Sequence, residues 1–403
     1  MTKSTSASAP GGRFVTLLVL YLGLFLFAYS VTLPLNAASE IASTLNVSAK
    51  DVWPVFSIFY FAWFCIIPAG AWLADKIGRK PLLIAGSLLL TLGMWGFSVS
   101  TTRIEGCAAQ FANGAGAILL QIVGIAAVTD LYAARRGGAL NVAVGLVGII
   151  AVLSPVMMGE LLQRGVAWTT VYHYSALLPA ALFVLQLFQK FPSAPAPITA
   201  QGEVENRATM GQLLTDPKFL LLIGAMYVYG IVESGIAIYA SQYLPEERGA
   251  SKSLTGYVGS GYWITASLVR LLAGMFFKVD RIPYSKQIVF SALAAAACVA
   301  LGTLPHNLTM AVTFLTLSGA AIALIWPSIM ALAATTTNAP ATTVFGLIVG
   351  IGGSLGAMSG AGVLGYVKST TGLSYEHSLL LLEIPLVLLV VMFSLRKDGA
   401  AAK

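Results

Sequence analysis

Long apolar runs alternate with short charged or Pro/Gly-marked breaks along the chain. A helix needs about 20 apolar residues to cross the roughly 30 Å hydrocarbon core of a bilayer. The runs of the first half predict spans at residues 14–38, 51–74, 81–101, 105–128, 138–162 and 167–190. Those of the second half predict spans at residues 218–243, 254–277, 286–304, 308–333, 340–366 and 374–395. We therefore predict an all-α membrane protein with twelve transmembrane helices in two six-helix halves.

A polar interruption separates the two sets of spans. Residues 191–217 are rich in Pro, Ala, Thr, Glu and Gln, which is typical of a linker and unsuited to insertion in a membrane. The predicted order is a cytoplasmic tail at 1–13, a half at 14–190, a cytoplasmic linker at 191–217, a half at 218–396 and a tail at 397–403.

Composition agrees with a membrane protein and excludes several other classes. Hydrophobic residues make up 57% of the 403 residues, charged residues make up 10%, and the mean hydropathy is +0.83. Such a chain is too apolar for a water-facing globular surface. The net charge of +7 is not gathered into a basic tail, so no nucleic-acid partner is expected. The three cysteines are widely spaced and there is no phosphate-binding loop, so we expect no metal, no cofactor and no enzymatic activity.

The distribution of Lys and Arg predicts the orientation. With both termini in the cytoplasm, 16 of the 23 Lys and Arg residues fall on the cytoplasmic side, six fall outside and one lies in a span. An excess of positive charge in cytoplasmic loops is the usual pattern of multi-pass proteins. We expect a protein of the (inner) cell membrane, surrounded by the lipid bilayer and monomeric.

A charged turn between the second and third spans carries the most specific motif. It reads GAWLADKIGRK over residues 70–80. Its pattern is Gly, four residues, Asp, a basic residue, one residue, Gly, Arg and a basic residue, filled by Gly70, Asp75, Lys76, Gly78, Arg79 and Lys80. This turn resembles the corresponding loop of the major facilitator superfamily, and the twelve spans with a central linker are similar to that architecture. The resemblance implies a secondary transporter of small molecules.

The resemblance also implies a cytoplasmic gate at this turn. Asp75 at a helix end can pair with basic side chains of the loop or with a helix N-terminus of the other half. A weaker copy of the motif, with Gly274, Asp280 and Arg281, follows the eighth span. The residues that we assign to the gate are Gly70, Asp75, Gly78, Arg79, Lys80, Asp130, Arg135 and Arg270.

Short stretches favour one branch of the superfamily over others. Residues 116–121, 135–141, 229–233, 270–274 and 325–329 resemble fucose and hexose porters. Members of that branch carry acids in spans one and four, whereas here span one has no central acid and the matching site in span four is Gln121. Gln110 also replaces an arginine that many relatives use in proton coupling. Ser154, Pro155 and Gly159 form part of a pattern shared by drug antiporters and sugar porters.

Glu233 is the acid that lies deepest within a span. An ionisable group inside a membrane helix is costly and is therefore a functional candidate. Because apolar surroundings disfavour a carboxylate charge, Glu233 suits a proton acceptor; its alternative is a structural bond within the bundle. We expect Arg270 to bond helix carbonyls, with a counter-ion to Glu233 or to an anionic substrate as the alternative.

The resemblance places a central cavity between spans one, four, seven and ten. Amides and aromatic rings suit a hydroxylated solute, because amides bond hydroxyls and rings stack on sugar faces. The candidate binding residues are Tyr29, Asn36, Asn113, Gln121, Tyr229, Glu233, Tyr239, Gln242 and Trp326.

Three hypotheses on the cargo remain open. The first is a proton-coupled transporter of a small polar solute such as a sugar, with Glu233 as the proton carrier. The second is an efflux antiporter for drugs or metabolites, favoured by the scarcity of charges in the cavity. The third is an organic-anion transporter that uses Arg270.

Overall fold

The computed structural model describes residues 10–48, 51–131, 152–189, 191, 208–275, 282–337, 339, 341–394 and 396, and all regular structure in these ranges is helical. The N-terminal half contains α1 (Pro10–Thr32), η1 (Leu35–Ala37), α2 (Ala38–Thr44), α3 (Trp53–Ile77), α4 (Arg79–Val99), α5 (Arg103–Leu131), α7 (Leu153–Gln163), α8 (Trp168–Ser175) and α9 (Leu177–Phe188).

The C-terminal half contains α10 (Met210–Leu213), α11 (Pro217–Arg248), α12 (Lys252–Met275), α13 (Tyr284–Thr303), α14 (Leu308–Ile322), α15 (Ile325–Thr336), α16 (Ala341–Leu347), the π-helical segment η5 (Ile348–Gly353), α17 (Ser354–Thr371), α18 (Tyr375–Leu380) and α19 (Glu383–Ser394).

Ten helices or helix pairs in the described ranges are long and apolar enough to cross a membrane. α7 and α12 occupy the places of the predicted fifth and eighth spans, and most of the fifth span lies outside the described residues. The predicted all-α fold with twelve membrane helices is confirmed.

Several spans that we predicted as single helices are broken. The breaks at Ala176, at Ala323 and at Leu381 each precede a proline by three or four residues. Proline has no N–H to donate to the carbonyl four residues earlier, so it weakens the helix at that point. The first span is interrupted at Pro34 in the same way, and continues as η1 and α2.

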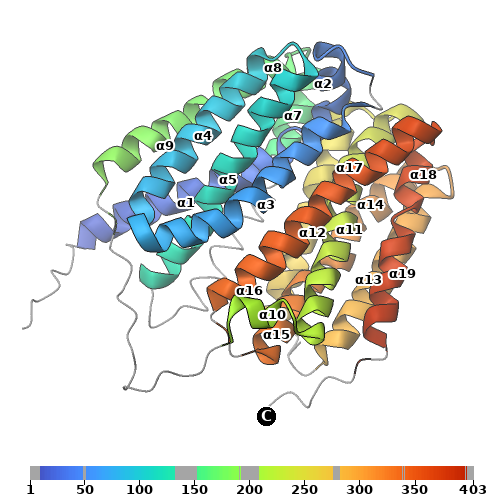
Figure 1. The fold of residues 1–403 in the computed structure, drawn as a ribbon. Helices are drawn as coiled ribbons and strands as arrows, with labels where there is room; N and C mark the ends of the chain where they lie inside the picture. The colour runs from blue at the N-terminus through green and yellow to red at the C-terminus, as the bar shows by residue number, and fades with distance from the viewer. Residues whose placement is uncertain are drawn as a thin grey trace, which may run out of the picture.

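The two halves meet at one end and diverge at the other. Figure 1 shows them closest toward the end of the molecule that contains α2, α8 and α18, which we call the contact end. They separate toward the end where α1 begins and α19 finishes, which we call the terminal end. α3 packs on α17, and α7 packs on α12. These two helix pairs form most of the boundary between the halves.

Glycines allow this close approach. A Cβ atom added to Gly365 would lie 2.2 Å from Trp53 Cβ, and one added to Gly256 would lie 2.6 Å from the carbonyl oxygen of Pro155. No side chain fits at those separations, so glycine is required where α17 meets α3 and where α12 meets α7.

Polar bonds reinforce the boundary near the contact end. Lys252 Nζ lies 3.0 Å from Glu40 Oε1 and 2.9 Å from Ser39 Oγ. Tyr257 donates its hydroxyl to Glu160 Oε1 at 3.0 Å. Three serine hydroxyls donate across the boundary to backbone carbonyls: Ser57 to Met358 (3.3 Å), Ser241 to Leu35 (2.5 Å) and Ser260 to Val152 (2.5 Å).

Reversing the charge of Lys252 should loosen the contact end. K252E places two carboxylates opposite each other, whereas K252E/E40K restores the attraction. Both partners are partly exposed, so we expect a change of about 0.5–1 kcal/mol, or roughly two- to fivefold in the equilibrium. The alkylation rate of a cysteine placed at Ser241, in a background without the native cysteines, should rise by that factor in K252E and return in the double variant.

Lys368 provides the matched control for this experiment. It bonds Leu373 O and lies over the Tyr375 ring, both within the C-terminal half. K368E should therefore leave the alkylation rate unchanged. Equal acceleration by K252E and K368E, or no recovery in K252E/E40K, would contradict the assignment.

Candidate functional site

Glu233 belongs to a chain of hydrogen bonds inside the C-terminal half. Tyr229, one turn earlier on α11, donates its hydroxyl to Glu233 Oε1 at 2.5 Å. Arg270 Nη2 on α12 donates to the Tyr229 oxygen at 3.4 Å. We call Tyr229, Glu233 and Arg270 the carboxyl triad. The phenol accepts from the guanidinium and donates to the carboxylate, so it connects the two charges.

The spacing of residues along α12 explains the position of Arg270. Lys252, Gly256, Gly259, Trp263 and Arg270 are separated by three, four or seven residues, which places them on one face of a helix. The first members of this series contact the N-terminal half. Arg270 therefore lies on the face of α12 that is turned toward the boundary between the halves.

Aromatic side chains of the N-terminal half approach Glu233 from α3. Tyr60 is buried and interacts electrostatically with Glu233. Its ring centroid is 5.1 Å from that of Trp63. Trp63 in turn lies 5.4 Å from Phe27 and 5.6 Å from Phe59, measured between ring centroids. A continuous aromatic cluster thus stands beside the carboxyl triad.

The C-terminal half adds two rings from α12. Tyr262 donates its hydroxyl to the backbone oxygen of Glu233 at 3.5 Å. The Tyr262 ring lies edge-on to Trp263, with 5.2 Å between the centroids. The set that we call the aromatic wall consists of Phe27, Phe59, Tyr60, Trp63, Tyr262 and Trp263.

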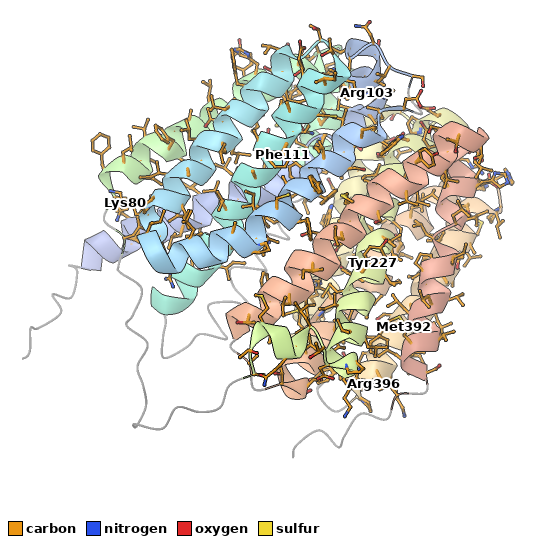
Figure 2. The ribbon with its side chains drawn as sticks, in the orientation of Figure 1. Lys80, Arg103, Phe111, Tyr227, Met392 and Arg396 are labelled. Atoms are coloured by element: carbon orange, nitrogen blue, oxygen red, sulfur yellow. The ribbon has the colours of Figure 1, made fainter. Side chains whose placement is uncertain are left out.

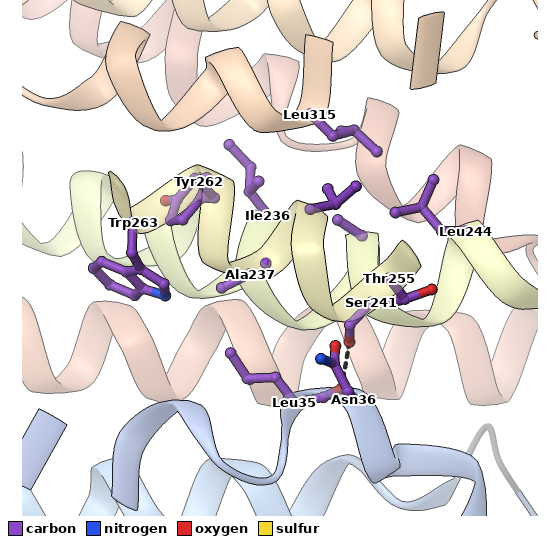
Figure 3. Close-up of a pocket in the computed structure, with 13 residues that line it drawn as sticks. Leu35, Asn36, Ile236, Ala237, Ser241, Leu244, Thr255, Tyr262, Trp263 and Leu315 are labelled. Carbon is purple, nitrogen blue, oxygen red and sulfur yellow. Dashed lines mark hydrogen bonds between the residues drawn. The ribbon is translucent and has the colours of Figure 1, made fainter. Parts of the chain in front are cut away.

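Unpaired polar atoms lie in the aromatic wall and beside it. Nε1 of Trp63 and Nε1 of Trp263 are buried and have no hydrogen-bond partner in the described structure, and the same is true of Asn36 Oδ1. Asn36 and Trp263 line a cavity of about 20 Å³ between η1, α11 and α12 (Figure 3). That volume holds about one water molecule. A buried donor without an acceptor costs about 1–3 kcal/mol, so a ligand that offers an acceptor to either indole would be stabilised.

Most of the other predicted binding residues of the N-terminal half bond within that half. Tyr29 shares a hydrogen bond with Ser175 Oγ at 2.6 Å. Asn36 Nδ2 donates to the Pro155 carbonyl at 2.8 Å. Asn113 is fully buried and donates to Gln110 Oε1 at 2.7 Å. Gln121 is partly buried on α5. These bonds occupy polar atoms that we expected to face a solute.

The predicted binding residues of the C-terminal half also bond mostly within their own half. Tyr239 donates to the carbonyl of Ala361 at 3.1 Å, and Gln242 donates to the carbonyl of Ile238 at 3.4 Å. Trp326 is partly buried near the start of α15. Of the predicted binding residues, the structure brings Tyr229 and Glu233 together in the carboxyl triad.

Of the predicted gate residues, Gly70, Asp75, Gly78, Arg79 and Lys80 belong to the end of α3, the turn and the start of α4, whereas Arg270, on α12, belongs to the carboxyl triad. Gly78 has φ +83°, a backbone conformation that favours glycine. A Cβ atom added to Gly70 would lie 3.0 Å from Cδ1 of Ile122. Lys80 Nζ donates to the Leu187 carbonyl at 2.8 Å, beside the end of α9 (Figure 2). Arg79 is the first residue of α4. The side chains of Asp75 and Asp130, and the whole of Arg135, lie outside the described structure.

The aromatic wall was not predicted, because the binding residues were sought in spans one, four, seven and ten. Tyr60 and Trp63 come from the second span, and Tyr262 and Trp263 from the eighth. The available signal was the sequence FYFAWF at residues 59–64, where aromatic residues outnumber aliphatic ones in the middle of a span.

Comparison with known proteins shows the family. A sequence model of the Major Facilitator Superfamily matches residues 20–361. The multidrug resistance protein MdtL of Escherichia coli O81 (strain ED1a) is 24% identical over 278 residues, which cover 68% of this chain and 70% of MdtL. MdtL of Shigella dysenteriae serotype 1 has the same identity over the same length.

Two solved structures share the fold. A bacterial homologue of the human lysosomal transporter Spinster, in an inward-facing and unoccupied conformation, has a TM-score of 0.76 at 15% identity and covers 96% of this chain and 97% of its own. A variant of the E. coli fucose:proton symporter FucP has a TM-score of 0.63 at 18% identity and covers 96% and 100%. The chain belongs to the major facilitator superfamily, and it is a membrane transporter rather than an enzyme.

Proposed function

We propose that this protein is a proton-coupled secondary transporter in which Glu233 binds the proton. The observation that carries the proposal is the carboxyl triad. A carboxylate inside a membrane helix is costly, and here a phenol and, through it, a guanidinium stabilise its charged form. A site with both apolar surroundings and a donor to the carboxylate can bind a proton and release it again.

The arrangement of the halves supports alternating access. They are joined at the contact end and apart at the terminal end (Figure 1). With cytoplasmic termini, as the distribution of Lys and Arg predicts, this arrangement is an inward-open state, and the turn with Gly78 and Lys80 is a gate that closes in the opposite state.

The geometry favours an amphiphilic organic cargo over a sugar. The amide N–H groups of Asn36, Asn113 and Gln242, which would donate to sugar hydroxyls, donate to protein acceptors instead, and the side-chain oxygens of Asn36 and Asn113 have no partner in the described structure. The aromatic wall offers stacking surface and two unpaired indole donors next to one carboxylate. The similarity to proteins named for multidrug resistance adds to this proposal. A sugar-like cargo remains the alternative, on the fold shared with FucP, and an organic anion bound by Arg270 is the second.

Replacing Glu233 by Gln should separate transport from proton coupling. E233Q keeps the size and hydrogen-bonding capacity of the side chain but cannot exchange a proton near neutral pH. We expect transport driven by a pH gradient in proteoliposomes to fall about a hundredfold or more, the lower end of the range for loss of a proton-transfer group. Exchange of cargo across the membrane without a gradient should stay within about twofold of the parent, since it needs no net proton movement.

Glu383 provides the matched control. It also lies within a predicted span, at the start of α19, and its Oε1 makes no hydrogen bond in the described structure. E383Q should retain driven transport. Full driven transport in E233Q, or an equal loss in both variants, would rule out Glu233 as the proton carrier.

The class of cargo can be tested at Trp63. W63L removes an aromatic face and an unpaired indole donor from the aromatic wall. An aromatic contact of about 0.5–1.5 kcal/mol corresponds to roughly a two- to tenfold weaker binding of an aromatic dye such as ethidium, measured by fluorescence with purified protein. W95L is the control, because Trp95 is 49% exposed on α4. If fucose binds and the dye does not, the cargo is sugar-like.

A further inference from the structure

A proline leaves one carbonyl of the tenth span without its helical partner. In a regular helix the N–H of residue 327 would donate to the carbonyl of residue 323, but residue 327 is Pro327. α14 ends at Ile322 and α15 begins at Ile325, so Ala323 lies in the break. An unpaired carbonyl inside a membrane protein is costly and must find another donor.

Arg270 supplies that donor. Its Nε lies 3.0 Å from the Ala323 oxygen, and its Nη2 lies 3.4 Å from the Tyr229 hydroxyl. Tyr229 donates to the Glu233 carboxylate. One guanidinium thus bonds the break between α14 and α15 on one side and, through Tyr229, the Glu233 carboxylate on the other. Three elements of the C-terminal half, α11, α12 and the break, meet at a single side chain.

Within the described ranges, the charged or titratable groups that interact with Glu233 come from α3, α11 and α12. Tyr60 approaches from α3, Tyr262 and Arg270 from α12, and Tyr229 from α11 itself. Of the other described elements packed against α11, α14, α15 and η5 contain no ionisable residue, whereas α17, α18 and α19 carry Tyr366, Lys368, Tyr375, Glu376, His377 and Glu383, none of which is hydrogen-bonded to Glu233. Among the described residues, Arg270 is therefore the cation that hydrogen bonds connect to Glu233, and it responds when Glu233 gains or loses a proton.

We propose that Arg270 is a positioning residue for proton coupling, which ties the charge state of Glu233 to the helix break that Pro327 creates. The inference rests on the proposed role of Glu233 as the proton carrier. When the carboxylate binds one proton, a single O–H bond forms and the negative charge is lost. The hydrogen bond from Tyr229 then changes from charge-assisted to neutral and weakens. Arg270 is held more by the Ala323 carbonyl and less by Tyr229, so the break and α12 can shift relative to α11.

The charge state of Glu233 can be followed without a cargo. The melting temperatures of the parent and of E233Q are measured in detergent as a function of pH. The difference between them changes over the pH range in which Glu233 ionises. R270Q removes the nearby positive charge, so the neutral carboxyl is favoured and this change should move to higher pH by about one unit. In P327A the backbone N–H of residue 327 can donate to the Ala323 carbonyl, so Arg270 can bond Tyr229 alone and stabilise the Glu233 carboxylate more. The change in the melting-temperature difference should then move to lower pH.

Pro68 provides the matched control for P327A. It also lies within a helix, α3, and Arg270 does not bond the carbonyl four residues before it. P68A should leave the position of the pH-dependent change unaltered. Each P327A and P68A profile is compared with the same variant carrying E233Q.

A double-mutant cycle tests the bond to the break. R270Q leaves the Ala323 carbonyl unpaired in the parent but not in P327A. The fall in melting temperature caused by R270Q should therefore be at least halved in the P327A background and undiminished in the P68A background. R270K serves if R270Q does not fold, since an ammonium group lacks the planar fork that reaches both partners.

Two results would overturn the inference while leaving the proposed function intact. The first is a pH profile of the melting-temperature difference that is unchanged in P327A. The second is a fall in melting temperature in R270Q/P327A equal to the sum of the falls in the two single variants. Both count when driven transport still depends on Glu233. Driven transport that survives E233Q would instead reject the proposed function itself.

Discussion

Backbone carbonyls without helical partners are the constraint on which this structure depends. Water cannot satisfy them inside a bilayer, so side chains must do so. The break before Pro327 creates such a carbonyl at Ala323, because residue 327 has no N–H, and Arg270 donates to it. Other side chains also donate to backbone carbonyls of neighbouring helices, among them Asn36 to Pro155, Ser57 to Met358, Tyr239 to Ala361, Ser241 to Leu35 and Ser260 to Val152.

This constraint has a direct effect on the site. Polar residues that bond the backbone have less capacity to bind a cargo. The amide N–H of Asn36 and the phenol of Tyr239 are therefore less available to a cargo than their residue types suggest. The groups that remain are aromatic faces, two indole N–H groups, the side-chain oxygens of Asn36 and Asn113, and the carboxyl triad. A site of this kind selects by shape and stacking more than by a pattern of hydroxyl groups.

The serine bonds between the halves also bear on the conformational change. Each neutral bond between Ser57, Ser241 or Ser260 and a carbonyl contributes about 1 kcal/mol, and the hydroxyl can turn to another acceptor when the halves part. Such bonds stabilise one conformational state by a small free energy and still allow the halves to separate. A large apolar interface would not separate as readily.

The sequence predicted the twelve spans and the family because hydropathy and the GAWLADKIGRK turn depend on local composition. It did not predict the helix breaks. Pro68 and Pro327 both lie in apolar runs, yet α3 continues through Pro68 while the tenth span breaks before Pro327. Whether a helix breaks at a proline depends on a donor from elsewhere, and the donor to Ala323 is 53 residues away in the chain.

The same limit applied to the candidate site. The depth of Glu233 in its span could be read from the sequence, since an acid in an apolar run is conspicuous. The partners of Asn113 or Gln242 could not, because a buried amide bonded to its own half has the same sequence context as one that faces a cavity. Tyr60 and Trp63 lie in an apolar run, where the sequence does not distinguish packing residues from residues beside Glu233.

α12 is continuous from Lys252 to Met275, whereas the tenth span, on which it packs, is broken between α14 and α15. Lys252, in the ion pair of the contact end, and Arg270, in the carboxyl triad, lie on the same face of this helix. Their separation of 18 residues corresponds to about 27 Å along a helix axis. An unbroken helix of that length transmits a tilt as a rigid lever, so a rotation of about 10° around the Lys252 end would displace Arg270 by about 5 Å. That displacement exceeds the length of a hydrogen bond, and separation of the halves at one end would therefore change the electrostatic environment of the carboxylate near the middle of the membrane.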